Sequence, residues 1–256
     1  MKRAAFLLYG LFSYAVFFAS FLYAIGFIGN FIVPKSIDSV PEAPLGTALF
    51  INTLLLAVFA LQHSIMARPA FKRWWTRIIP AAAERSTYVL LSSLALILLF
   101  ALWEPMGGVI WAIESPVGAG IAWGIYAIGW LILLYATFAI NHFDLFGLRQ
   151  SWAAFRGREP EPLQFVQPWL YRVVRHPIYV GWFLIMWATP VMTVAHLFFA
   201  VISSVYMLVG IQLEERDLID MHPEYVGYKK RVPALVPSLK RLFRRADDST
   251  LAEARQ

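Results

Sequence analysis

Residues 178–213 read IYVGWFLIMWATPVMTVAHLFFAVISSVYMLVGIQL, an apolar stretch without a single charged residue and with Pro190 near its middle. A helix needs about 20 apolar residues to cross a bilayer. The stretch is therefore too long for one ordinary span and too short for two full ones. We predict a helical hairpin that enters the membrane and returns to the side from which it started.

Four further apolar runs precede this stretch and are long enough to cross a membrane. They cover residues 4–33, 45–66, 86–103 and 117–140. The chain is 59% hydrophobic, whereas soluble domains contain roughly 45–50% apolar residues. We predict an all-α, polytopic transmembrane bundle in one domain, residues 1–256, with four spans plus the hairpin and thus five or six membrane helices.

The basic residues predict the orientation of this bundle. If the N-terminus is cytoplasmic and residues 178–213 form a hairpin, all but one of the 22 Lys and Arg lie on the same side. Lys35 is the exception. Cytoplasmic loops of membrane proteins carry an excess of Lys and Arg, so we expect both termini in the cytoplasm. The net charge of +6 then reflects topology, and we expect no nucleic-acid partner.

The connecting segments differ in character. Residues 34–47 and 104–116 are expected to be external loops, and AFKRWWTRII at residues 70–79 a helix on the membrane surface. Residues 244–256 are charged and expected to be disordered. The chain has no cysteine, which excludes disulfides and thiolate metal sites, and we expect no metal.

The first group of candidate site residues is RHPIYVG, residues 175–181, where a cytoplasmic loop enters the hairpin. Pro177 suits a first helical turn, because its missing N–H would have no partner there. His176 and Tyr179 are three residues apart and can share a helix face. Gly181 allows close approach to the backbone. The alternative interpretation is an interfacial anchor of Arg, His and Tyr.

The second group is Glu214 and Glu215 at the end of the hairpin. Carboxylates at a membrane exit are costly unless solvated or paired. Because a hairpin returns its end close to its start, we expect these residues beside His176 and Tyr179. Such a pocket suits a polar, partly cationic ligand. The alternative is a solvated helix face shared with Arg216.

The third group lies in EYVGYKKRVPALVPSL, residues 224–239. Tyr225, Tyr228 and Arg231 are spaced three residues apart and fall on one helix face. The alternative is a basic helix on anionic lipid, and we assign Lys229 and Lys230 to that role.

RHPIYVG and the later EERDLIDMHPEYVGYKKRVPALVP, residues 214–237, together resemble the C-terminal signature of the isoprenylcysteine carboxyl methyltransferase family. The resemblance implies that S-adenosylmethionine binds to residues 141–243, around the hairpin. It also implies that Arg231 lies near the reaction centre. The cofactor-binding residues that it implies are Arg175, His176, Tyr179, Gly181, Glu214, Glu215, Tyr225 and Tyr228.

The N-terminal part narrows the resemblance. FIGNFIVPKSID, QHSIMARPAFKRWWTRIIP, ERSTYVL and NHFDLFGLRQ are similar to the bacterial branch of the family that methylates methanethiol to dimethyl sulfide. The resemblance implies an enzyme of the bacterial cytoplasmic membrane that acts at its cytoplasmic face by in-line methyl transfer to the thiolate. Its partners would be a small thiol and the lipid bilayer, without a required protein partner.

Thiol methylation needs a thiolate, because the thiolate is the nucleophile. An alkanethiol is a weaker acid than cysteine, so a base or a cation must assist its ionisation. The candidates are His63, an ionisable residue within the second apolar run, and His142, Asp144 and Arg149 after the fourth. His142 and Asp144 could form a dyad only if the chain turns back. Otherwise Asn141 ends a helix and Asp144 is solvated.

Other functions remain open from the residues alone. The acceptor could be another thiol, or it could be a prenylated cysteine or a lipid. A prenylated cysteine or a phospholipid amine would need a wider cleft between helices. Membrane reductases of related architecture would bind NADPH instead. A non-enzymatic membrane scaffold would use the basic tail to hold anionic lipid.

Overall fold

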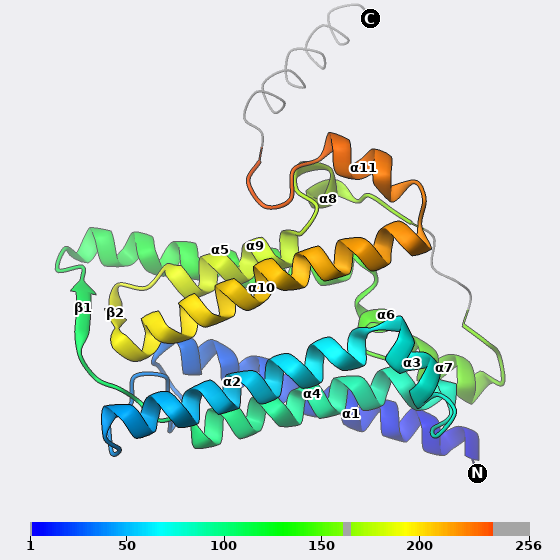
Figure 1. Ribbon diagram of the computed structural model, residues 1–256, viewed down its shortest axis with the longest axis horizontal. Coiled ribbons are helices and arrows are strands. Elements are labelled where there is room, and N and C mark those ends of the chain that lie inside the picture. The colour runs from blue at the N-terminus through cyan, green and yellow to red at the C-terminus, as the bar shows by residue number, and fades with distance from the viewer. Residues whose placement is uncertain (1, 161–164, 238–256) are drawn as a thin grey trace, which may run out of the picture.

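The computed structural model describes residues 2–160 and 165–237 and is almost entirely helical (Figure 1). Within these residues, five helices are long and apolar enough to cross a membrane. They are α1 (Lys2–Gly29), α2 (Leu45–Ala67), α4 (Ala81–Leu102), α5 (Pro116–Ile140) and α10 (Val194–Met221). A polytopic all-α membrane protein is therefore confirmed. Residues 244–256, expected to be disordered, lie outside the described residues.

Local sequence explains where the spans begin and end. Pro44, Pro80 and Pro116 stand at the start of α2, α4 and α5, where a missing N–H costs nothing. The side chain of Ser115 also accepts a hydrogen bond from the first turn of α5. Between these ends the residues are apolar, and a helix satisfies every backbone polar group internally, as lipid requires.

The hairpin is present, but its two arms differ. The first arm is the 11-residue helix α9 (Pro177–Trp187) followed by an extended segment that includes strand β2 (Val191–Thr193). Such a helix rises only about 16 Å, roughly half of a hydrocarbon core. The second arm, α10, is a full span that continues beyond residue 213 to Met221.

A short strand pair makes the extended half of the first arm possible. Strand β1 (Val109–Ala112) pairs antiparallel with β2, so that Val109 lies opposite Thr193 and Ala112 opposite Val191. The pairing supplies hydrogen bonds that an isolated strand in an apolar environment would lack. Apolar content alone did not distinguish this strand from a helix.

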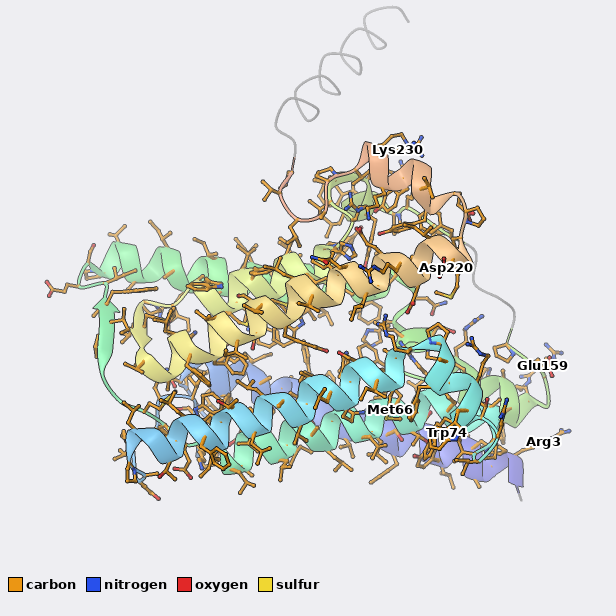
Figure 2. All side chains as sticks on the ribbon, viewed as in Figure 1. Arg3, Met66, Trp74, Glu159, Asp220 and Lys230 are labelled. Atoms are coloured by element: carbon orange, nitrogen blue, oxygen red, sulfur yellow. The ribbon has the colours of Figure 1, made fainter. Side chains whose placement is uncertain are left out.

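The elements divide between two ends of the bundle (Figure 1). One end, here called the strand end, holds β1 and β2. The other, here called the basic end, holds the N-terminus and the short helices α3 (Pro69–Trp75), α6 (His142–Leu145), α7 (Leu148–Arg156), α8 (Trp169–Val173) and α11 (Tyr225–Arg231). Arg3, Trp74 and Lys230 mark the basic end in Figure 2. This grouping agrees with the charge pattern, and the cytoplasmic location of the basic end stays a prediction.

Helix α9 is held against α5 by two glycines that face each other. A Cβ added to Gly181 would lie 2.7 Å from the carbonyl oxygen of Gly129, and one added to Gly129 would lie 2.9 Å from that of Gly181. The two backbones are therefore in direct contact, which sets the position of the N-terminus of α9. We expected Gly181 to admit close approach, and the group that approaches it here is α5.

Gly181→Ala should destabilise the protein by roughly 1–3 kcal/mol, because the methyl group has no space between the helices. Gly124→Ala is the control. Gly124 lies on α5, the helix that packs against α9, and nothing lies within 4 Å of a Cβ added there. Thermal unfolding of both variants in detergent checks this. Equal unfolding temperatures for the two variants would contradict the close packing of α5 and α9.

Candidate active site

The carboxylate of Glu215 on α10 lies at the centre of the polar cluster at the hairpin's end. Glu215 is only 4% exposed. Its Oε1 lies 2.7 Å from Nε of Arg175 and 3.0 Å from Nε2 of His176, and its Oε2 lies 2.7 Å from Nζ of Lys229. The hydroxyl of Tyr225 donates a fourth hydrogen bond at 3.4 Å. A buried carboxylate is tolerated only with such partners, so Glu215 acts as a structural support.

The segment that carries these partners is also fixed through its backbone. The N–H groups of Arg175 and His176 donate to the carbonyl oxygens of Pro233 (2.9 Å) and Ala234 (3.1 Å). The guanidinium of Arg175 donates to the carbonyl oxygen of Val232. The RHP and PALVP stretches, more than fifty residues apart in sequence, therefore form one unit beside α10.

Helix α11 closes this unit with two buried tyrosines. Tyr225 bonds to Glu215, and the hydroxyl of Tyr228 donates to the carbonyl oxygen of Tyr171. Burial raises the pKa of Tyr228 to about 12 and also raises the pKa of Tyr225, so both remain hydrogen-bond donors. Arg231 is exposed, and its Nε donates to the carbonyl oxygen of Gly227 in its own helix.

Lys229 corrects one interpretation of the sequence. We assigned it to contact with anionic lipid, but its ammonium group pairs with Glu215. The sequence could not reveal this pairing. Lys229 is followed directly by Lys230 and Arg231, and such a run of basic residues is equally typical of a helix that contacts anionic lipid.

Glu214 differs from Glu215 in almost every respect. Its side chain is 44% exposed. The hydroxyl of Tyr179 donates to its Oε2 at 3.0 Å, and Nδ1 of His176 lies 3.9 Å from the same oxygen. Its Oε1 has no hydrogen-bonding partner among the described residues. Glu214 is therefore the carboxylate that can accept a cationic ligand, and the expected proximity of Glu214 and Glu215 to His176 and Tyr179 is present.

His63 lies near this cluster, on α2. The hydroxyl of Tyr88, on α4, is 3.0 Å from its Nε2 and 3.1 Å from its Nδ1, and the hydroxyl of Ser92 is 3.3 Å from the same Nδ1. The ring of Phe59 stacks on that of His63 and packs against Tyr206 on α10, which turns His63 toward the helix that carries Glu214. Tyr88 was missed as a candidate, although the stretch ERSTYVL that contains it carried part of the family resemblance.

Two further contacts join α2 and α10. The hydroxyl of Ser64 donates to that of Tyr206 at 3.2 Å, and Arg68 pairs with Asp217 at 2.8 Å. These two contacts align the basic-end halves of α2 and α10. His63 and Glu214 therefore lie on two helices that contact each other close to both residues.

His142 and Asp144 do not form a dyad, because each has its own partners. The hydroxyl of Thr137 donates to the carbonyl oxygen of Leu134, so Nδ1–H of His142 donates to Thr137 (2.9 Å) and Nε2 accepts from Tyr14 (2.8 Å). Burial lowers the pKa of His142, which favours this neutral form.

Asp144 pairs with Arg149 at 2.7 Å instead. Asn141 ends α5 with a left-handed backbone, φ 112°, and its side chain accepts a hydrogen bond from the N–H of Asp144. The helix end that we considered at Asn141 is thus present. Asp144 and Arg149 form an ion pair at that end, which tightens the turn.

Known proteins match almost the whole chain, and three of them are compared with it here. The methanethiol S-methyltransferase of Crocosphaera subtropica is 55% identical over 93% of this chain and 93% of its own length. Methanethiol S-methyltransferase 2 of Bradyrhizobium diazoefficiens is 53% identical over 96% and 95%, and the methanethiol S-methyltransferase of Mycobacterium tuberculosis is 49% identical over 93% and 98%. No protein-family model and no solved structure matches the chain.

A helical membrane bundle with its polar motifs gathered at one end is the architecture that the resemblance to the isoprenylcysteine carboxyl methyltransferase family predicts for a membrane methyltransferase. With about half of its residues identical to three such enzymes over more than nine-tenths of its length, the chain belongs to the methanethiol S-methyltransferase family. The family predicted from RHPIYVG and the N-terminal segments is thereby confirmed.

Glu215→Ala should lower stability by about 3–5 kcal/mol, because it leaves Arg175 and Lys229 without their buried partner. Glu214→Ala should change stability by less than about 1 kcal/mol, because the side chain is half exposed. Detergent unfolding followed by tryptophan fluorescence compares the adjacent substitutions. Equal losses of stability in both variants would contradict the different roles assigned to the two carboxylates.

Proposed function

We propose that the protein transfers a methyl group from S-adenosylmethionine to methanethiol, forming dimethyl sulfide, at the cytoplasmic face of the bacterial inner membrane. The observation that carries the proposal is the half-exposed carboxylate of Glu214, held by Tyr179 at the hairpin's end. It occurs in a chain about half identical to three methanethiol S-methyltransferases.

The residues around Glu214 fit the chemistry of this methyl donor, which carries a sulfonium and an ammonium group. Glu214 offers Oε1 to one of these cations while Tyr179 fixes Oε2. The positive charges of Arg175 and Lys229 are directed to Glu215, so they leave the charge of Glu214 uncompensated. A cationic ligand is therefore favoured at Glu214.

The remaining cofactor residues that we predicted fall into supporting positions. Arg175, His176 and Tyr225 hold Glu215 in place, and Tyr228 joins α11 to the segment before α9. Their contribution to binding is to keep the N-terminus of α9 and the end of α10 at a constant separation. Correct placement of a methyl donor and a nucleophile contributes strongly to the rate.

His63 and Tyr88 are proposed to take the thiol proton. The hydroxyl of Tyr88 lies 3.0 Å from Nε2 and 3.1 Å from Nδ1 of His63. We assign proton acceptance to Nε2, because Nδ1 also has the hydroxyl of Ser92 within 3.3 Å. Tyr88 passes its hydroxyl proton to Nε2 as it receives the proton of the thiol, which leaves a thiolate. Held at Glu214, the cofactor would supply the methyl group to the thiolate sulfur and would leave as an uncharged thioether.

Purified protein in detergent, given methanethiol and S-adenosylmethionine, should form dimethyl sulfide that headspace gas chromatography detects only when both are present. Glu214→Gln should weaken cofactor binding at least about tenfold, the effect of one charge-assisted hydrogen bond, as measured by calorimetry. Glu224→Gln, an exposed carboxylate on the same end, is the control. Wild-type protein that binds no cofactor and forms no product would refute the proposal.

His63→Gln should lower the rate about 100-fold near pH 7, the usual range for loss of a general base, while calorimetry shows unchanged cofactor affinity. The deficit should shrink as pH rises. Methanethiol then ionises in solution, so a base on the protein is no longer required. Rate profiles from pH 6 to 10 test this, and parallel profiles for variant and wild type would argue against proton transfer through His63.

A further inference from the structure

A second site is suggested by a cavity of about 200 Å³ between α1 and α5, near the basic end. Its walls are largely aromatic and aliphatic, and its polar groups come from Tyr14, Thr137 and His142. Phe18, Leu134 and Phe138 also line it and are partly exposed on the outer surface of membrane-spanning helices. The cavity thus borders the lipid-facing side of the bundle.

The polar groups of this cavity are satisfied by one another. Both ring nitrogens of His142 are hydrogen-bonded, one to Tyr14 and one to Thr137. A ligand with a charge or several hydrogen-bonding groups would find no partner there, and its desolvation would be costly. A neutral sulfur compound is compatible, because thiols are weak donors and sulfur packs favourably against aromatic rings.

The size of the cavity limits the ligand further. One water takes about 30 Å³ in the liquid, so a molecule of two or three heavy atoms takes roughly two or three times that volume. Methanethiol and dimethyl sulfide fit within about 200 Å³. A prenylated cysteine, with its long isoprenoid chain, does not fit.

The cavity shares a wall with the region around His63. Phe17 and Phe146 both line it, and their rings stack with centroids 3.8 Å apart. The same two rings pack against the buried cluster that contains Met66 and Tyr88. Tyr88 is in turn hydrogen-bonded to His63. A pair of phenylalanine rings therefore stands between the cavity and the proposed proton-accepting residues.

We propose that this cavity is a holding site for methanethiol and for dimethyl sulfide, reached from the membrane and separated from the reaction centre by the Phe17–Phe146 stack. The inference rests on the proposed function, because that function supplies the identity of the small sulfur compound. The thiol enters sideways from lipid, passes the two rings and meets Tyr88. The cofactor approaches from the opposite, aqueous side at Glu214.

Leu134→Trp tests the site by filling it. Leu134 lines the cavity and is 38% exposed, so the larger side chain can occupy the mouth without disturbing the core. The control is Leu131→Trp on the same helix, 64% exposed and outside the cavity lining. We expect the KM for methanethiol to rise about tenfold in Leu134→Trp, with unchanged cofactor affinity and wild-type behaviour in Leu131→Trp; tenfold corresponds to about 1.4 kcal/mol.

A direct binding measurement separates this inference from the proposed function. Saturation-transfer NMR should detect dimethyl sulfide on wild-type protein and on Leu131→Trp, with the signal lost in Leu134→Trp. Wild-type KM and binding in Leu134→Trp would overturn the holding site while leaving the enzyme assignment intact. A wild-type protein that transfers no methyl group would refute the proposed function. The NMR measurement would still show whether the cavity binds dimethyl sulfide. If Leu134→Trp does not bind the cofactor, the protein is misfolded and a second variant is needed. Phe18→Trp then fills the mouth of the same cavity from α1 and is measured in the same way.

Discussion

The carboxylate of Glu215 connects the end of α10, the start of α9 and helix α11 through Arg175, His176 and Lys229. Removing a carboxylate from water costs several kcal/mol, and only well-placed partners offset this. Because these partners are committed to Glu215, the neighbouring Glu214 keeps its charge available. The arrangement of the candidate site thus follows from one buried ion cluster, and the carboxylate proposed to bind the cofactor stands next to it rather than within it.

Hydropathy and charge were sufficient to predict the spans and the hairpin. The uncharged stretch around Pro190 and the concentration of Lys and Arg on one side required a chain that returns, and the return brings Glu214 and Glu215 to His176 and Tyr179. Local chemistry could not tell the two carboxylates apart. Adjacent helix residues point about 100° apart, and which one faces inward depends on how α10 is rotated against α9 and α11.

Other features depended on contacts that no local pattern reveals. Gly181 was expected to serve a ligand, whereas its backbone meets Gly129 on α5, a residue about fifty positions earlier. Strand β2 lies within an apolar run and exists because β1 pairs with it. His142 looked like a possible base, but Tyr14, from the first span, occupies one of its ring nitrogens. In each case the deciding partner lies on a different element.

The backbone contact between Arg175–His176 and Pro233–Ala234 has a consequence for biosynthesis. The ribosome delivers α9 and most of α10 to the membrane before the residues that hold the start of α9 in place have emerged from it. During that interval Lys229 and the carbonyl groups that complete the cluster around Arg175 and Glu215 are not yet accessible. The cluster around Glu215 is therefore completed only after residues 229–234 have emerged and folded back against the start of α9.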